Sequence, residues 1–198
     1  MSLKSCLSMS AGAILLLATA PAFAVTSWPS ASLMASGTAD SCAAASAAAQ
    51  EGGHVSDTAL ATCTLAVKLA YVNSARAEVL NNRSVLNYVR GDYDAALADN
   101  TAALKLNDRM AEAIVNRGSI FLMQHRPQAA AANFDHALQF NPAHPEKVYF
   151  NRALAREDMG DLNGAYADYA QAAKLAPQWD APKREMNRFS IVRQKPIS

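Results

Sequence analysis

Alanine and aromatic residues recur in the second half of this chain at spacings that fit one face of an α-helix. Three stretches repeat the spacing i, i+4, i+7: Ala96, Asn100 and Ala103; Ala130, Phe134 and Ala137; and Ala165, Tyr169 and Ala172. An α-helix completes a turn in about 3.6 residues, so each set forms a single stripe. The pattern predicts three helices that each pack through that stripe.

A second pattern precedes each of these helices. Asn82-Arg83-Ser84 recurs as Asn116-Arg117-Gly118 and again as Asn151-Arg152-Ala153, at nearly equal steps, with Pro145 as the one inserted residue. Glycine turns separate the two halves of the first and third copies at Gly91 and Gly160, whereas the middle copy has His125-Arg126-Pro127 there. The chain is therefore predicted to repeat a helix–turn–helix unit three times.

A period of about 34 residues, with a small residue where two helices cross, is typical of helical-hairpin solenoids. On these residues the chain resembles the tetratricopeptide repeat family. The resemblance covers residues 77–110, 111–144 and 146–179, and the small crossing residue is Ser84, Gly118 and Ala153 in turn. It implies an all-α fold, a right-handed solenoid of three helical hairpins.

The stretch from Met1 to Ala24 has the features of a secretory signal peptide. Lys4 is its only charge, a short apolar run follows, and Ala22-Phe23-Ala24 fits a cleavage site before Val25. The run is too short for a membrane span, which needs about 20 apolar residues. We expect residues 25–38 to be a flexible linker, and the mature chain to be exported to a bacterial periplasm or, alternatively, to the extracellular space.

Two cysteines remain after such a cleavage, Cys42 and Cys63. They flank Gly52-Gly53 at similar distances, between expected helices at about 40–50 and 57–73, so in an antiparallel hairpin they face each other. We predict a disulfide that stabilises by roughly 3 kcal/mol; two free thiols in a metal or redox site are the alternative. Residues 39–76 then form a degenerate repeat that caps the solenoid, and residues 180–198 a capping helix and tail.

The balance of charged residues and the absence of known catalytic motifs limit the classes of function that fit this chain. The chain has 18 Lys and Arg against 17 Asp and Glu, a balance that argues against nucleic acid as a partner. None of the four histidines pairs with another at i, i+4, and no nucleophile or phosphate-binding motif is present. We therefore predict no enzymatic activity, no cofactor and no metal site.

Two polar ladders run through the repeats. Arg83, Arg117 and Arg152 precede Asp99, Asn133 and Asp168, respectively, at one constant separation, which predicts a polar contact across each hairpin. In the resembling family the first helices line a concave surface, where asparagines can hold the backbone of an extended peptide. The resemblance thus implies a partner-binding groove formed by Asn82, Asn116, Asn151, Val85, Tyr88, Ser119, Leu122, Met123, Phe150 and Leu154.

The asparagines have a second interpretation of equal weight. Instead of holding a bound peptide, they could bond to the backbone of the next repeat.

The predicted function is a non-catalytic protein-interaction module or scaffold of the bacterial cell envelope that binds an extended partner segment. The alternative is a structural solenoid that stacks end to end or occludes its own groove with Phe189, Ile191 and Val192.

Overall fold

Helical hairpins follow one another in a curved stack. The computed structural model describes residues 31–193, so the predicted signal peptide and its cleavage site at Ala24 and Val25 lie outside the described residues. The described elements are α1 (Ala31–Gln50), α2 (Asp57–Leu69), α3 (Asn73–Val89), α4 (Tyr93–Leu106), α5 (Ala111–Met123), α6 (Pro127–Leu138), α7 (Pro145–Asp158), α8 (Leu162–Leu175) and α9 (Asp180–Arg193).

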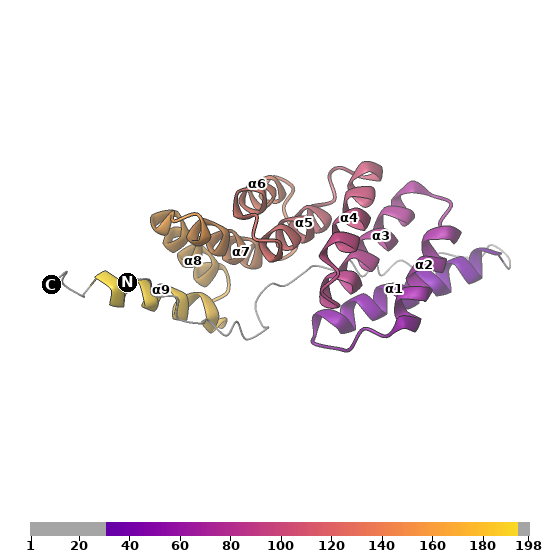
Figure 1. Ribbon diagram of the computed structural model, residues 1–198, viewed down its shortest axis with the longest axis horizontal. Coiled ribbons are helices and arrows are strands. Elements are labelled where there is room, and N and C mark those ends of the chain that lie inside the picture. The colour runs from indigo at the N-terminus through magenta and orange to yellow at the C-terminus, as the bar shows by residue number, and fades with distance from the viewer. Residues whose placement is uncertain (1–30, 194–198) are drawn as a thin grey trace.

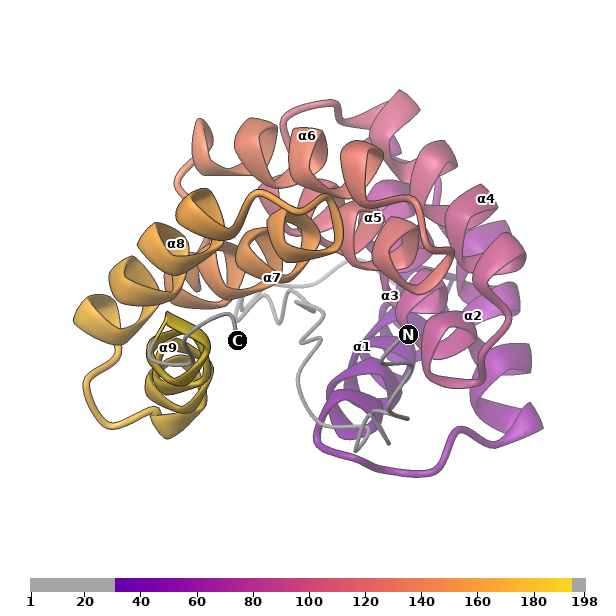
Figure 2. The same ribbon diagram turned by 60° about the vertical axis from the view of Figure 1, so that its left-hand side comes forward.

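The first helices of the three repeats lie on one side of the stack, and the second helices lie on the other. The molecule is elongated, with α1 and α2 at one end and α8 and α9 at the other (Figure 1). Seen from the side, α3, α5 and α7 lie on the inner side of the arc, and α4, α6 and α8 lie on its outer side (Figure 2). The predicted all-α solenoid of helical hairpins is confirmed.

The turns explain why each hairpin reverses where it does. Gly91 and Gly160 both adopt a φ of 82°, a left-handed conformation that glycine adopts without a steric cost. Asp92 and Asp161 then cap the following helices by accepting hydrogen bonds from Ala95 N at 3.1 Å and Gly164 N at 2.9 Å. In the middle unit His125 takes the left-handed position with a φ of 55°.

The predicted stripes form the hairpin cores. Ala96, Ala130 and Ala165 are buried, as are the two central aromatic residues, Phe134 and Tyr169. Gly118 of α5 crosses directly over the Phe134 ring, and a Cβ at that position would lie only 2.6 Å from Phe134 Cε1. The middle hairpin therefore requires glycine at its crossing point.

The amino-terminal hairpin carries the predicted disulfide. Cys42 of α1 and Cys63 of α2 are bonded with a Cα–Cα distance of 4.8 Å, and both residues are fully buried. The helix bounds differ from the prediction. The first helix begins at Ala31 rather than near Asp40, so residues 31–38 of the expected linker are helical. The second helix ends at Leu69 rather than near Asn73, and Asn73 is the first residue of α3.

Candidate functional site

The three inner helices α3, α5 and α7 carry all ten predicted groove residues (Figure 2). Seven of them are buried: Asn82, Asn116, Asn151, Val85, Ser119, Leu122 and Phe150. Tyr88, Met123 and Leu154 remain partly exposed. The three partly exposed side chains do not occupy equivalent positions: Tyr88 and Met123 follow the ladder asparagine of their unit by six and seven residues, and Leu154 follows its asparagine by three.

The asparagine ladder links successive units. Asn116 Nδ2 donates to Asn81 Oδ1 at 2.9 Å, and Asn151 Nδ2 donates to Ser119 Oγ at 3.4 Å. Each acceptor is a side chain of the preceding unit, not backbone of the following unit as the structural alternative had it. The Oδ1 atoms of Asn82 and Asn151 are buried without a hydrogen-bond partner among the described residues.

A buried polar cluster at the junction of the first two units was not anticipated from the sequence. Asn81 Oδ1 accepts from Asn116 and also from Asn100 Nδ2, at 3.3 Å. Asn100 occupies the position that Phe134 and Tyr169 fill in the other units. That replacement of an aromatic residue by an amide was the signal available in the sequence. With both donors on its oxygen, the orientation of the Asn81 amide is fixed, and its Nδ2 has no partner among the described residues.

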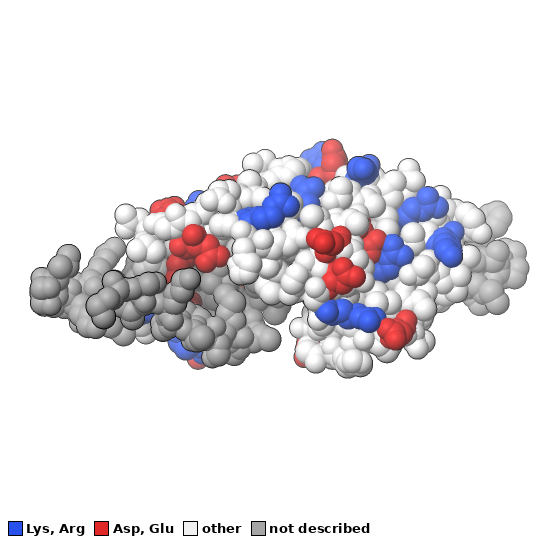
Figure 3. Space-filling model, viewed as in Figure 1, with Lys and Arg blue, Asp and Glu red and all other residues white. Residues whose placement is uncertain are grey.

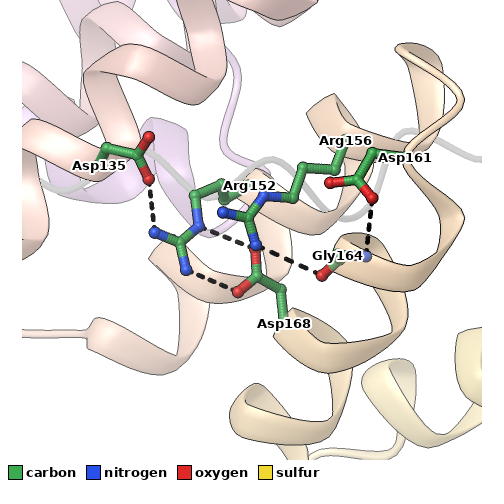
Figure 4. A network of polar contacts seen from close by, with 6 residues as sticks. All are labelled: Asp135, Arg152, Arg156, Asp161, Gly164 and Asp168. Atoms are coloured by element: carbon green, nitrogen blue, oxygen red, sulfur yellow. Dashed lines mark hydrogen bonds and ion pairs between the residues drawn. The ribbon is translucent and has the colours of Figure 1, made fainter.

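The arginine ladder pairs within each hairpin as predicted. Arg83 binds Asp99 through two hydrogen bonds of 2.8 and 2.6 Å, and Arg152 binds Asp168 in the same way. Arg152 also reaches Asp135 of the preceding unit, and Arg156 joins Asp168 from the next turn (Figure 4). Arg83 and Arg152 thus each form a bidentate contact with a carboxylate.

The middle rung of the arginine ladder lacks a carboxylate. Arg117 Nε donates to Asn133 Oδ1 at 2.7 Å, so its half-buried cation faces a neutral amide. Burial lowers the pKa of Arg117, whereas the hydrogen bond to Asp99 raises the pKa of Arg83. Arg117 is therefore the one arginine of the ladder without a carboxylate partner among the described residues.

Trp179 and the carboxyl-terminal helix α9 pack on the third unit. Trp179 packs on Phe150 with 4.8 Å between ring centroids, and Arg188 Nη2 contacts both carboxylate oxygens of Glu157 at 2.6 and 2.7 Å. Phe189 lies against Tyr166 and Tyr169 of α8. The side chains of Ile191 and Val192, named with Phe189 as a possible groove plug, lie outside the described residues.

Other kinds of site find no support in the described part of the chain. No group of three His, Cys, Asp or Glu side chains between residues 31 and 193 could hold a metal ion. None of the helices described has the length and apolar composition to cross a membrane. On the face drawn in Figure 3, acidic and basic side chains are interspersed rather than gathered in a patch of one sign.

Comparisons with known proteins agree with this architecture. The family model described as tetratricopeptide repeat matches residues 146–178. A TPR repeat-containing thioredoxin of Arabidopsis thaliana is 36% identical over 85 residues, 43% of this chain and 22% of that protein. The chain thus matches only a small part of this relative.

Two solved structures share the fold. The first TPR of Spaghetti (RPAP3) bound to the HSP90 peptide SRMEEVD superposes with a TM-score of 0.59 at 23% identity, covering 63% of this chain and 98% of that one. A MamA double mutant (RS-1 ArsTM) gives a TM-score of 0.67 at 16% identity, covering 82% of this chain and 86% of that one. Both identities are low, so these likenesses concern the fold alone.

Proposed function

Because the chain is built from tetratricopeptide repeats, we propose that it is a non-catalytic protein-interaction module that holds an extended partner segment against α3, α5 and α7. The observation that carries this proposal is that each inner helix leaves an apolar side chain partly exposed, namely Tyr88 on α3, Met123 on α5 and Leu154 on α7. Such side chains offer contacts to an extended chain, and concave solenoid faces are common binding surfaces. The peptide bound to the first TPR of Spaghetti (RPAP3) shows that this fold can hold a short segment.

The asparagines take a structural part in the proposal. The donor groups of Asn116 and Asn151 are used between units, so they hold neighbouring inner helices together. The acceptors of Asn82 and Asn151 have no partner among the described residues, but both atoms are buried and lie out of reach of a bound segment. The partly exposed apolar side chains therefore supply the contact area, and the amides position the helices that carry them.

The test compares two triple variants of the mature chain. In the groove variant, Tyr88, Met123 and Leu154 are changed to alanine. In the control, Leu65, Leu162 and Leu175, which are 48%, 49% and 44% exposed on α2 and α8, are changed instead. Proteins captured from an envelope extract are crosslinked and quantified by mass spectrometry. We expect the groove variant to lose partners that the control retains; an identical set captured by both rules out the groove.

We further propose that the protein is exported and works in the periplasm. The buried Cys42–Cys63 disulfide supports this, because disulfides persist in oxidising compartments and are rare in the cytosol. The signal-like stretch from Met1 to Ala24 points the same way. Mass analysis of the protein from an envelope fraction should give a chain that starts at Val25, and a cytosolic full-length chain with free thiols contradicts the proposal.

A buried acceptor sequence favours a bacterial route over secretion through an N-glycosylating pathway. Asn82-Arg83-Ser84 matches the pattern for N-glycosylation. Asn82 is only 3% exposed, however, and Ser84 Oγ donates to Ala96 O at 2.8 Å inside the hairpin. A glycan on Asn82 has no room in this fold, so the proposed compartment is one in which this asparagine stays unmodified.

A further inference from the structure

The ladder arginines of the first and third units are bonded through all three nitrogen atoms of the guanidinium. In the third unit, Nε and Nη2 of Arg152 bind Asp168, and Nη1 donates to Asp135 Oδ1 at 2.6 Å (Figure 4). Arg83 of the first unit uses the same three atoms, two for a carboxylate of its hairpin and one for a threonine hydroxyl of α2. Both guanidinium groups are therefore fully engaged within the chain.

Arg117 occupies the equivalent position of the second unit and uses one of these three atoms. Its Nε donates to Asn133 Oδ1 at 2.7 Å, and its Nη1 and Nη2 have no hydrogen-bond partner among the described residues. The Asn133 amide supplies no second acceptor, because its Nδ2 is a donor and bonds to Ala129 O. Thr101 holds the position that Asp135 has in the next unit. The second unit thus lacks both of the carboxylates that bind the arginine of the third.

The side chain one turn further along α5 differs in the same sense. Asn87 of the first unit and Arg156 of the third each donate to the carboxylate of their hairpin, at 3.1 and 2.8 Å. Phe121 holds this position in the second unit, and Arg126 Cζ lies 4.5 Å from the centre of its ring. Residues i and i+4 are neighbours on a helix, so Phe121 lies beside Arg117. The second unit has therefore lost the supporting donor together with the carboxylate.

No acidic side chain of the surrounding helices opposes the charge of Arg117. The acidic residues of α4 and α6 are bonded to other side chains: Asp94 to Gln124, Asp99 to Arg83 and Asp135 to Arg152. Glu112, the one acidic residue of α5, lies five residues before Arg117 and so on another face of the helix. Burial lowers the pKa of Arg117, and no neighbouring carboxylate raises it.

We propose that Arg117 binds an oxyanion supplied from outside the chain, held through Nη1 and Nη2 between α4 and α6. Arg152 of α7 reaches α6 and α8 in this way, so Arg117 of α5 reaches toward α4 and α6. A carboxylate of a bound protein segment and a free phosphate both offer two oxygen atoms to such a pair of donors. The half-burial of the guanidinium strengthens the contact.

This site is separate from the inner face. Figure 2 shows α4 and α6 on the outer side of the arc, whereas the partner segment is proposed to lie against α3, α5 and α7. The oxyanion site does not rest on the proposed function, and its failure would leave that function untouched.

The first test follows the arginine side chains of the isotope-labelled chain from Val25 by NMR. Inorganic phosphate and acetate are added in separate titrations, with the ionic strength held constant by chloride. We expect the Arg117 Nε–H resonance to shift and saturate. Those of Arg83 and Arg152 should move little, because carboxylates of the chain already occupy them. An Arg117 resonance that moves no more than these two overturns the proposal.

Matched variants test whether the free edge of the guanidinium is the binding group. Asn133→Asp supplies an internal carboxylate, as in the first and third units, and should weaken anion binding roughly tenfold or more. Arg117→Lys keeps the charge without the planar pair of donors, and should lose the rise in melting temperature that phosphate gives the parent. Lys174→Gln removes an exposed cation from the third unit and should bind as the parent does.

The two anions identify the kind of oxyanion. Saturation by acetate at lower concentration than by phosphate assigns a carboxylate, such as an acidic side chain of a partner, and the reverse order assigns a phosphate. All variants are checked by circular dichroism, and Asn133→Asp still decides the question if Arg117→Lys does not fold. Unchanged binding in Asn133→Asp, or equal weakening in Lys174→Gln, means an adventitious ion only and contradicts the site.

Discussion

At the scale of single residues, equivalent positions of the three units differ in chemistry, and each difference has a local consequence. The position filled by Phe134 and Tyr169 holds Asn100 in the first unit, where a polar cluster replaces an aromatic contact. The position of Asp99 and Asp168 holds Asn133 in the second, where Arg117 loses a charged partner. Repetition of the fold therefore does not imply repetition of the interactions.

The middle rung of the arginine ladder yields a stability prediction. Asn133→Asp should place a carboxylate beside Arg117, as in the first and third units, and raise the free energy of unfolding by about 1 kcal/mol. The loss of the bond from Asn133 Nδ2 to Ala129 O limits the gain. Denaturant unfolding measures the change. In an Arg117→Met background the same substitution should give no gain, and an equal gain there contradicts the charge pairing.

Asp158 yields a prediction about pH. Burial and the neighbouring Glu157 raise its pKa above the ordinary value of 3.8, although the charge of His125 opposes this. The folded state then binds the proton more tightly than the unfolded state. The contribution of the Asp158 carboxyl to the free energy of unfolding is fully present at pH values below the ordinary pKa. It is lost as the pH rises through the raised pKa of the folded state.

Asp158→Asn removes that loss. The variant should melt higher than the parent at about pH 7 and lose this advantage at about pH 3, where the parent carboxyl is protonated in both states. Thermal melts of both proteins across this range measure the effect. A difference in melting temperature that does not change with pH means that Asp158 acts through packing instead.

At the scale of elements, the crossing point decides how closely the two helices of a hairpin approach. Ser84, Gly118 and Ala153 occupy it. In the second hairpin Phe134 lies so close that only glycine fits. In the first, the Ser84 hydroxyl donates to Ala96 O across the hairpin, and in the third, Ala153 is buried in one cluster with Tyr169.

Gly118→Ala tests this packing. The added Cβ would lie 2.6 Å from the buried Phe134 ring, so we expect a net loss of stability. Overpacking costs about 1–3 kcal/mol, while the better helix propensity of alanine returns up to about 1 kcal/mol. Phe134→Leu should reduce the loss when combined with it. If Gly118→Ala stabilises the parent protein, the crossing is looser than described.

At the scale of the whole molecule, the two ends are closed in different ways. The amino-terminal hairpin is fixed by the Cys42–Cys63 bond, and α1 also packs on α3. The carboxyl-terminal end relies on Trp179, Phe189 and the Arg188–Glu157 pair. Both arrangements cover the apolar face of a terminal unit, and neither covers it completely.

Removal of the disulfide should weaken the amino-terminal end first. We expect Cys42→Ala with Cys63→Ala to lower the stability of α1 and α2 by roughly 3 kcal/mol, the magnitude for a loop of this size. Hydrogen exchange should show faster exchange in α1 and α2 and little change in α7 and α8. Uniform acceleration through all helices means instead that the solenoid unfolds as one cooperative unit.

The sequence by itself determined the local elements of this protein. Periodicity predicted the hairpins, glycine and aspartate predicted their turns, and cysteine spacing around Gly52-Gly53 predicted the disulfide. The rungs of the arginine ladder followed as well, because both partners lie in one hairpin at a fixed spacing. Interactions within a unit depend on short stretches of chain, and short stretches carry that information.

Only the tertiary structure decided how the units meet. The asparagines were visible in the sequence, but their acceptors in the preceding unit, Asn81 and Ser119, depend on how neighbouring first helices pack. The same packing buries seven of the ten predicted groove residues and leaves Tyr88, Met123 and Leu154 partly exposed. Burial depends on the relative placement of helices that belong to different units, which the periodicity of any one helix does not specify.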